Sequence, residues 1–330
     1  MYETAYHQGS LENSTFLVTG GAGFIGSHLV EYLLKWKAGK IIILDNLATG
    51  FAENIEPFLK APNIEWINGD ITVEADCNRA MKGVDYVLHQ AALGSVPRSV
   101  ENPIATNKTN IDGFLNILVA AKNEKVKRVV YASSSSVYGD SKILPKKEEQ
   151  IGKPLSPYAV TKLVNEQYAD VFVKTYGMEI IGLRYFNIFG PRQNPSGAYA
   201  AAIPLFMNAL LSGKDAYING DGGQTRDFTF VANAVQANIK ATFAPFNKNI
   251  DQVYNVAVSD RVSIKELYQT LMKLTGSIIP PVHREERAGD IRDSLADISK
   301  ATKELNYQPE VKVQDGLSIT LDWFKKAFFS

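Results

Sequence analysis

The sequence has little cysteine and no long hydrophobic run. Cys77 is the only cysteine among 330 residues, so no intrachain disulfide can form, and we interpret it as a buried, unreactive thiol. No apolar stretch approaches the roughly 18 to 20 residues of a transmembrane helix. The first residues, MYETAYHQGSLENS, lack the basic start and apolar run of a signal peptide. The sequence therefore predicts a cytoplasmic protein without a membrane-spanning segment.

An excess of charge of one sign is also missing. Lys plus Arg and Asp plus Glu both number 35, so no overall field attracts nucleic acid or an acidic membrane surface. We expect neither as a partner, and no metal site is predicted. The composition, 45% hydrophobic and 21% charged, is that of an ordinary globular protein.

Short apolar segments alternate with helical patterns through the first half of the chain. The predicted strands are residues 15–19, 40–45, 64–69, 84–92, 126–134 and 178–185, and helices are predicted from residue 27, at 104–124 and at 157–175. This alternation is typical of a parallel sheet covered on both faces, which is a doubly wound Rossmann α/β fold. The first dozen residues are expected to form an appended arm or a short helix.

The composition changes after residue 186, where glycine and proline become frequent and helices at 200–212 and 263–275 are separated by long loops. Residues 228–259 again have the pattern of sheet and covering helix. We therefore predict an NAD-binding Rossmann domain of residues 1–186 plus 228–259, and a smaller, discontinuous α/β substrate domain of residues 187–227 plus 260–330.

A glycine-rich turn follows the first predicted strand. The segment TGGAGFIGSH places Gly20, Gly23 and Gly26 between a strand and a helix, where glycines permit a tight turn and close approach of a pyrophosphate. Asp45 ends the next strand, where a carboxylate can accept the ribose hydroxyls of NAD and would repel the 2′-phosphate of NADP. NAD is the predicted cofactor. The other candidate cofactor-binding residues are Phe24, Ile25, Asn46, Asp70, Ile71, Gln90, Ala91, Ala92, Tyr158, Lys162 and Tyr185.

Three residues form a candidate catalytic group. Ser134 lies in a run of hydroxyls at the carboxyl end of a predicted strand, where open parallel sheets bind ligands. Tyr158 and Lys162, in SPYAVTK, are four residues apart and share one helix face. The lysine ammonium is expected to lower the pKa of the phenol, with help from a nicotinamide cation, and so make Tyr158 a base for a sugar hydroxyl. Ser134 can orient or relay that proton.

These motifs resemble the extended short-chain dehydrogenase/reductases, specifically the UDP-hexose 4-epimerases, including those acting on N-acetylhexosamines. The resemblance runs from Phe16 to about Tyr307 and includes TGGAGFIGSH, SSSSVYG, SPYAVTK, LRYFNIFGPRQ, TRDFTFV and RAGDIRDSLAD. It implies that hydride passes from sugar C4 to a resident NAD and returns to the other face of a 4-keto sugar. The related dehydratases and decarboxylases have a carboxylate in the loop after the catalytic strand, whereas this chain has serines and Val137.

The resemblance also implies substrate contacts. A diphosphate is expected at Arg226 and Arg287, and the uridine at Tyr217, Asn219 and Asp290. Asn187 is expected to contact the diphosphate or the sugar oxygen next to it. Hexose-only relatives have a tyrosine at the position of Ser294 and some have a lysine at that of Gly94, so small residues there leave room for an N-acetyl group. The full set of candidate substrate-binding residues is Gly94, Ser95, Ser134, Ser135, Ser136, Tyr158, Asn187, Tyr217, Asn219, Arg226, Arg287, Asp290 and Ser294. This predicts exchange of UDP-GlcNAc and UDP-GalNAc, in a role of supplying surface polysaccharide synthesis.

Other functions stay open at this point. UDP-glucose or UDP-glucuronate could be the substrate, and Arg98 could be the basic side chain that a glucuronate needs. A non-catalytic NAD-binding sensor or scaffold is an alternative of a different class, although it has no need of Ser134, Tyr158 and Lys162. The apolar faces of the helices near 104–124 and 157–175, together with the resemblance, predict a homodimer joined through a four-helix bundle.

Overall fold

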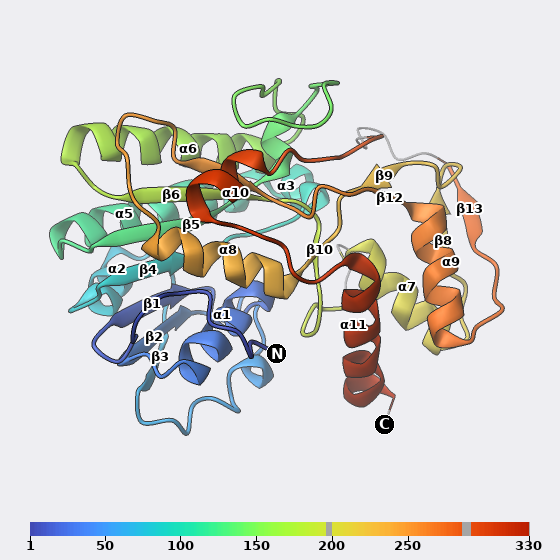
Figure 1. Cartoon of the computed structure of the whole chain (residues 1–330), viewed down its shortest axis with the longest axis horizontal. Coiled ribbons are helices and arrows are strands. Elements are labelled where there is room, and N and C mark those ends of the chain that lie inside the picture. The colour runs from blue at the N-terminus through green and yellow to red at the C-terminus, as the bar shows by residue number, and fades with distance from the viewer. Residues whose placement is uncertain (196–199, 286–291, 330) are drawn as a thin grey trace.

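The computed structural model describes residues 1–195, 200–285 and 292–329, and its centre is a seven-stranded parallel sheet (Figure 1). In spatial order the strands are β3 (Ile64–Asn68), β2 (Lys40–Asp45), β1 (Thr15–Thr19), β4 (Tyr86–His89), β5 (Arg128–Ser134), β6 (Ile180–Tyr185) and β11 (Val253–Val256). The chain order reverses between β1 and β4, and each neighbouring pair is parallel. The predicted Rossmann α/β fold is confirmed.

Helices cover both faces of this sheet because its strands are apolar on both sides. Phe16 and Val18 of β1 belong to one buried cluster, and Leu17 between them belongs to another. The first cluster takes in α1 (Phe24–Lys35) and α8 (Val231–Phe243), and the second takes in α2 (Glu74–Met81), α5 (Gly113–Asn123) and α6 (Pro157–Tyr176). The helix α10 (Ser299–Leu305) packs beside α8 and β11.

The helix predicted at 104–124 is broken into three consecutive segments. These are α4 (Pro103–Asn107), a π-helical stretch at Lys108–Asp112, and α5. The shorter helix α3 (Val96–Glu101) precedes them. The π stretch contains Asn110, whose side chain leaves the helix to bind the loop after β4.

Shorter elements gather beyond the carboxyl end of β6 (Figure 1). The helices here are α7 (Ala202–Leu211), α9 (Ile264–Thr275) and α11 (Val313–Phe328). Three two-stranded sheets accompany them: β7 (Ile188–Phe189) with β10 (Thr229–Phe230), β8 (Tyr217–Asn219) with β13 (Val282–Arg284), and β9 (Thr225–Arg226) with β12 (Val262–Ser263). Two 3-10 turns lie at η1 (Ala52–Asn54) and η3 (Ser135–Tyr138). The division into two discontinuous domains stays a prediction.

The first thirteen residues form an arm without helix or strand that packs along α1. The Tyr2 hydroxyl lies 2.8 Å from Nδ1 of His28, and Tyr6 stacks on Tyr32 with ring centroids 5.3 Å apart. His7 hydrogen-bonds the Tyr32 hydroxyl at 2.7 Å. Aromatic contacts therefore fix the arm on the outer side of the helix that follows the glycine-rich turn. Across the described residues, no helix has both the length and the apolar character needed to span a bilayer.

Candidate active site

The glycine-rich turn joins β1 to α1 in a conformation that requires glycine. Gly20 has φ of +68°, and a Cβ added there would lie 2.7 Å from the amide nitrogen of Ala91. A Cβ on Gly26 would lie 2.1 Å from the carbonyl oxygen of Gly20. The helix α1 begins at Phe24 after Gly23, whose position offers no side-chain cap to the first N–H groups. The turn is thus shaped to present a bare helix N-terminus to an anion such as a pyrophosphate.

Asp45 lies at the carboxyl end of β2, beside this turn. Its carboxylate accepts the N–H of Ala22 at 2.9 Å and that of Leu47 at 2.8 Å, and burial raises its pKa above the usual value. Asn46 donates to Asp70 at 3.0 Å, so the loops after β2 and β3 are joined. The buried Ile71 follows. The loop that follows Asp45, the predicted ribose ligand, is therefore joined to the loop that carries the candidate cofactor residues Asp70 and Ile71.

The next strand ends lie at the same edge of the sheet. Ala91, after β4, donates its N–H to the hydroxyl of Thr19 at 3.3 Å, and the half-buried Ala92 follows. The side-chain oxygen of Gln90 accepts from the Tyr185 hydroxyl at 3.0 Å, and the Asn238 amide donates to that hydroxyl at 2.7 Å. The glycine cradle, the acidic strand end and these neighbouring loops together fit a dinucleotide such as NAD.

The carboxyl end of β5 contacts the helix α6. Ser134 hydrogen-bonds the phenol of Tyr158. The ammonium of Lys162 donates to the carbonyl oxygen of Ala132 at 2.7 Å and lies 5.9 Å from the centre of the Tyr158 ring. The helix starts here because Pro157 occupies its first turn and the Ser156 hydroxyl accepts the N–H of Ala159. The three predicted catalytic side chains are therefore brought together.

Burial dominates the electrostatics of this group. It raises the pKa of the Tyr158 phenol, and the hydrogen bond with Ser134 only partly offsets this. The decrease expected from the sequence is therefore not produced by the protein's own groups, because desolvation of the tyrosinate outweighs them. Burial also lowers the pKa of Lys162 to about 8, against an opposing effect of Glu166. His89, buried on β4 next to Lys162, has its pKa lowered to about 3 and is neutral.

The sequence analysis missed Asn110, which connects the loop after β4 to the helix α6. Asn110, in the π stretch, accepts the N–H of Leu93 at 2.8 Å and donates to the hydroxyl of Thr161 at 3.1 Å. Its backbone carbonyl accepts from the Asn165 side chain at 2.8 Å. Asn110 thus ties the loop that leads to Gly94 to the helix that carries Tyr158 and Lys162. The signal was present, since Asn and Asp at 107, 110 and 112 are poor residues for a continuous helix.

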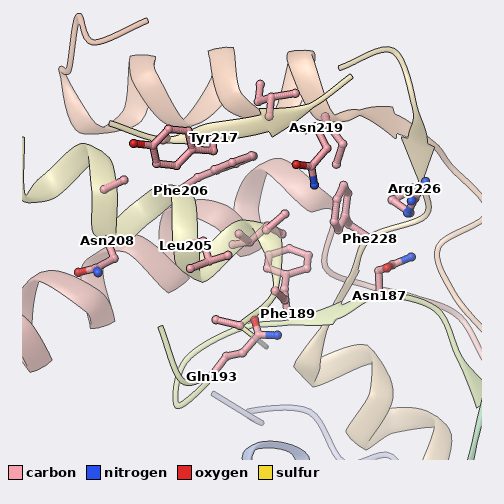
Figure 2. A pocket seen from close by; sticks show the side chains of 18 of the residues that line it. Asn187, Phe189, Gln193, Leu205, Phe206, Asn208, Tyr217, Asn219, Arg226 and Phe228 are labelled. Carbon is pink, nitrogen blue, oxygen red and sulfur yellow. The ribbon is translucent and has the colours of Figure 1, made fainter. Parts of the chain in front are cut away.

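A cavity of about 660 Å³ opens beside β7, β8 and β9 (Figure 2). Four predicted substrate residues line it together: Asn187, Tyr217, Asn219 and Arg226. In Figure 2, Tyr217 lies toward one end, and Arg226 and Asn187 lie toward the other, with Phe189, Phe228 and Leu205 between them. An apolar cleft with a few polar groups at its ends suits a small ligand that is polar in part.

Two arginines in this cavity have different surroundings. Arg226 is held by the carbonyl oxygens of Thr225 at 2.9 Å and Arg292 at 3.2 Å. Arg284, which the sequence did not single out, lies over the ring of Tyr217 with its guanidinium carbon 3.2 Å from the ring centroid. One cation is thus tied to backbone and the other covers an aromatic face.

The predicted residues around the sugar are small and mostly half-buried. Ser294 is buried, and its N–H donates to Thr225 at 3.2 Å, one residue before Arg226. A Cβ on Gly94 would meet nothing within 4 Å. Ser95 caps α3, and Ser135 lies in η3. The hydroxyl of Ser136 is buried and has no hydrogen-bond partner in the described part of the chain. Arg287 and Asp290 lie outside the described residues.

Within residues 1–195, 200–285 and 292–329, no three His, Cys, Asp or Glu side chains cluster as metal ligands would.

Buried Cys77 has its pKa raised to about 12, chiefly by burial. Its thiol donates to the carbonyl oxygen of Ile71 at 3.2 Å. The prediction that Cys77 is buried is confirmed, and a raised thiol pKa agrees with the low reactivity expected of it.

Comparison with known proteins agrees with this geometry. Residues 16–257 match the family model described as the NAD dependent epimerase/dehydratase family. A putative UDP-glucose 4-epimerase of Methanocaldococcus jannaschii is 37% identical over 94% of this chain and 98% of its own length. A UDP-N-acetylglucosamine 4-epimerase of Methanobrevibacter ruminantium, solved with UDP-N-acetylmuramic acid, is 40% identical with a TM-score of 0.90, covering 96% of this chain and 99% of that one.

A third relative was solved with its cofactor. The UDP-glucuronic acid 4-epimerase of Bacillus cereus, in complex with UDP-glucuronic acid and NAD, is 32% identical with a TM-score of 0.87, covering 94% of this chain and 99% of that one. The parallel sheet, the glycine cradle and the Tyr158–Lys162 pair define a Rossmann-fold, NAD-dependent enzyme of the extended short-chain dehydrogenase/reductase class. The chain belongs to the NAD-dependent epimerase/dehydratase family, and within it to the UDP-sugar 4-epimerases.

Proposed function

We propose that this epimerase interconverts UDP-GlcNAc and UDP-GalNAc. The observation that carries the proposal is the small buried Ser294, whose backbone is bonded beside Arg226 at the cavity. The open space at Gly94 gives further room for an acetamide. The 40% identity to a UDP-N-acetylglucosamine 4-epimerase supports the same substrate. Supply of GalNAc-type sugars for surface polysaccharide is the matching cellular role, and a host that makes no such glycan would contradict it.

The chain's own residues perform the proton chemistry. Tyr158 takes the proton of the sugar 4-hydroxyl, and Ser134 holds that hydroxyl or relays its proton. Lys162 stays charged through its bond to Ala132 and favours the tyrosinate that this step requires. NAD, when bound at the glycine cradle, supplies the hydride acceptor and an adjacent positive charge. Because the same base acts in both directions, no further acid is needed.

The cavity is assigned to the UDP half of the substrate. We assign Arg226 to the diphosphate, since a guanidinium fits phosphate oxygens in pairs, and Asn187, which lines the same cavity, is assigned with it. Tyr217 and Asn219 are assigned to the uridine. Ser95, Ser135 and Ser136 are assigned to the sugar, where the unpartnered hydroxyl of Ser136 suits an acetamide oxygen. Arg287 and Asp290 stay candidates for the diphosphate and the ribose.

The same proposal includes a homodimer. The helices α3, α4 and α6 pack together and leave apolar side chains outside: Val100 is 65% exposed, Ile104 81% and Val160 47%. Exposed apolar residues gathered on adjacent helices mark a surface that another protein covers. Pairing the helical segment from α4 to α5 and the helix α6 of two copies would make the four-helix bundle expected from the sequence, with α3 at its edge.

The first test is turnover without added cofactor. The purified protein is incubated separately with UDP-GlcNAc, UDP-Glc and UDP-glucuronate, and the products are followed by NMR. We expect a UDP-GlcNAc/UDP-GalNAc mixture to form fastest. Faster conversion of UDP-Glc or UDP-glucuronate would keep the Tyr158 chemistry and replace the proposed sugar. Retention of NAD without turnover of any of the three would indicate a sensor or scaffold.

A further inference from the structure

Behind the candidate catalytic group lies a buried ion pair to which the proposed chemistry assigns no role. Glu166 of α6 and Arg184 of β6 are joined by two hydrogen bonds, Nε to Oε1 at 2.9 Å and a terminal nitrogen to Oε2 at 2.8 Å. Their side chains are only 8% and 3% exposed. Burying two charges is costly unless geometry and further hydrogen bonds compensate, so a pair placed here calls for a function.

The pair completes a regular correspondence between β5 and α6. Ala132 accepts from Lys162 at 2.7 Å, Ser133 donates to Glu166 at 2.5 Å, and Ser134 bonds Tyr158. Tyr158, Lys162 and Glu166 are four residues apart along one helix face. Three consecutive strand residues are thus each fixed to one of three stacked helix residues. The hydrogen bond from Ser133 to Glu166 is the second of these three contacts, and without it the end of β5 that carries Ser134 would be held less firmly against α6.

Arg184 extends the same network to the loop beyond β5. Its other terminal nitrogen donates to the Tyr138 hydroxyl at 3.1 Å and to the Glu148 carbonyl at 2.8 Å. The Tyr138 hydroxyl donates in turn to Asn255 of β11 at 2.7 Å. The next residue along β6 is Tyr185, a candidate cofactor contact. The network therefore links the strand ends that surround the reacting atoms.

The charges around Lys162 come from few groups. The titratable groups on its own helix are Tyr158 and Glu166. The neutral His89 of β4 also lies next to Lys162. Beyond Glu166 lie Arg184, the buried phenol of Tyr131 and the carboxyl of Asp251. The guanidinium of Arg184 binds both carboxylate oxygens of Glu166. Among the described residues packed here, Glu166 is the negative group on the same helix face as Lys162.

We propose that Glu166, held by Ser133 and Arg184, is a positioning residue of the epimerase: it sets β5 against α6 so that Ser134 meets Tyr158, and it supplies the negative group on the helix face of Lys162. This inference rests on the proposed roles of Ser134, Tyr158 and Lys162. Glu166 touches neither substrate nor cofactor in this scheme. Its removal should therefore change the rate of the proton step and its pH dependence, and leave the affinity for the UDP half intact.

The test compares Glu166→Gln with a matched control at the other end of the same two strands. There Arg128 of β5 binds Glu179, which precedes β6, at 3.0 and 2.5 Å. For Glu166→Gln, with resident NAD and UDP-GlcNAc as substrate, we expect kcat to fall by about 10- to 100-fold with KM within twofold. The alkaline limb of the kcat profile should move about one pH unit lower, because Lys162 loses the negative charge of Glu166 and the guanidinium of Arg184 is left without its partner. Glu179→Gln should lower the melting temperature and leave kcat and its pH profile unchanged.

Two further measurements keep the proposal falsifiable. NMR of 13Cε-labelled lysine, assigned with Lys162→Met, reports the Lys162 titration without any turnover, so it separates this inference from the proposed reaction. We expect its midpoint to fall in Glu166→Gln and to recover in Glu166→Gln/Arg184→Met, which removes both charges. If Glu166→Gln fails to fold, Ser133→Ala removes only the hydrogen bond from Ser133 to Glu166 and should lower kcat severalfold with the alkaline limb unmoved. An unchanged Lys162 midpoint in folded Glu166→Gln, or full activity of Ser133→Ala, would overturn the proposal.

Discussion

The ammonium of Lys162 lies 5.9 Å from the centre of the Tyr158 ring and is held there by the carbonyl oxygen of Ala132. The cation is therefore held next to the phenol by the protein's own backbone. This preorganisation is what a tyrosine base needs, because burial alone raises the pKa of Tyr158.

Tyr158→Phe removes the proposed base and almost no volume. We expect kcat to fall by about 10²- to 10⁴-fold while NAD content and melting temperature stay near those of the wild type. NMR turnover, the absorbance of released cofactor and a thermal melt measure these three quantities. Tyr176→Phe, at the exposed end of the same helix, serves as the control. Activity of Tyr158→Phe close to that of the wild type would refute the assignment of the base.

Ser294→Tyr fills the space proposed for the acetamide. We expect kcat/KM for UDP-GlcNAc to fall at least tenfold further than kcat/KM for UDP-Glc, because only the acetylated sugar would meet the new ring. Ser294→Ala keeps the space and should cost only the contribution of one hydrogen bond, about 1 kcal/mol. Equal losses on both substrates in Ser294→Tyr would remove the argument for an acetyl-tolerant pocket.

Gly26→Ala places a methyl group against the carbonyl oxygen of Gly20, at an unrelaxed distance of 2.1 Å. The turn must open to relieve this contact, so we expect the purified variant to contain little NAD and to unfold at lower temperature. Gly94→Ala is the matched control, since its methyl group meets nothing within 4 Å and should leave NAD content unchanged. Normal NAD content in Gly26→Ala would mean that the turn does not cradle the cofactor.

Ile104→Arg tests the proposed dimer. A charge at this 81% exposed position would be desolvated in a helix bundle, so the mass in light scattering should fall from about twice to about once 36.4 kDa. Ile278→Arg is the control, because Ile278 is 90% exposed and follows α9, which is not part of the proposed interface; it should leave the mass unchanged. A monomeric wild type, or an unaffected mass in Ile104→Arg, would exclude this interface.

The buried His28 predicts a loss of stability in mild acid. Its Nε2 donates to the Pro191 carbonyl at 2.9 Å, so its Nδ1 accepts from Tyr2 and Arg192, both at 2.8 Å. Burial and the nearby guanidinium hold its pKa well below the usual value. Below about pH 6.5 the unfolded chain therefore binds a proton that the folded chain does not, and stability falls as the pH falls.

We expect this residue to contribute a slope of about 1.4 kcal/mol per pH unit below pH 6. Urea unfolding of wild type and His28→Gln at several pH values measures it, because the other titrating groups cancel in the difference. Tyr6→Leu, which removes the stacking on Tyr32, should be destabilised by the same amount at every pH. Parallel curves for wild type and His28→Gln would show that His28 is not held neutral.

The sequence was most informative where chemistry and position are both local. The turn at Gly20 and Gly26 and the pair Tyr158–Lys162 were predicted because each depends on a spacing of a few residues. The acid at Asp45 was predicted because it ends the next strand of the same strand–helix–strand unit. The stacking of Tyr6 on Tyr32 could not be predicted, because contact across 26 residues depends on how the arm packs. The pairing of Glu166 with Arg184 joins a helix to a strand and was missed for the same reason.

The electrostatic error had a different origin. The sequence showed which charges are near Tyr158, but it did not show how far the phenol is removed from water, and desolvation proved the larger effect. Asn187, Tyr217 and Arg226 were named as substrate contacts from a resemblance, and the structure shows that they line one cavity. The position of Arg284 over Tyr217 could not be predicted in this way, because it depends on strand register.

The π-helical stretch at Lys108–Asp112 should make this part of the chain sensitive to the deletion of a single residue. A π turn accommodates one more residue than the α-helical turn that it replaces, so a single-codon deletion there would restore regular α-helix. The preceding helix α4 would then rotate by about 100° relative to α5, since each residue turns an α-helix by that angle. The Asn110 side chain would leave both Leu93 and Thr161. A deletion that preserves the reading frame and shortens no loop would therefore be more damaging here than most substitutions, and alignments of related chains should avoid placing a gap at this point.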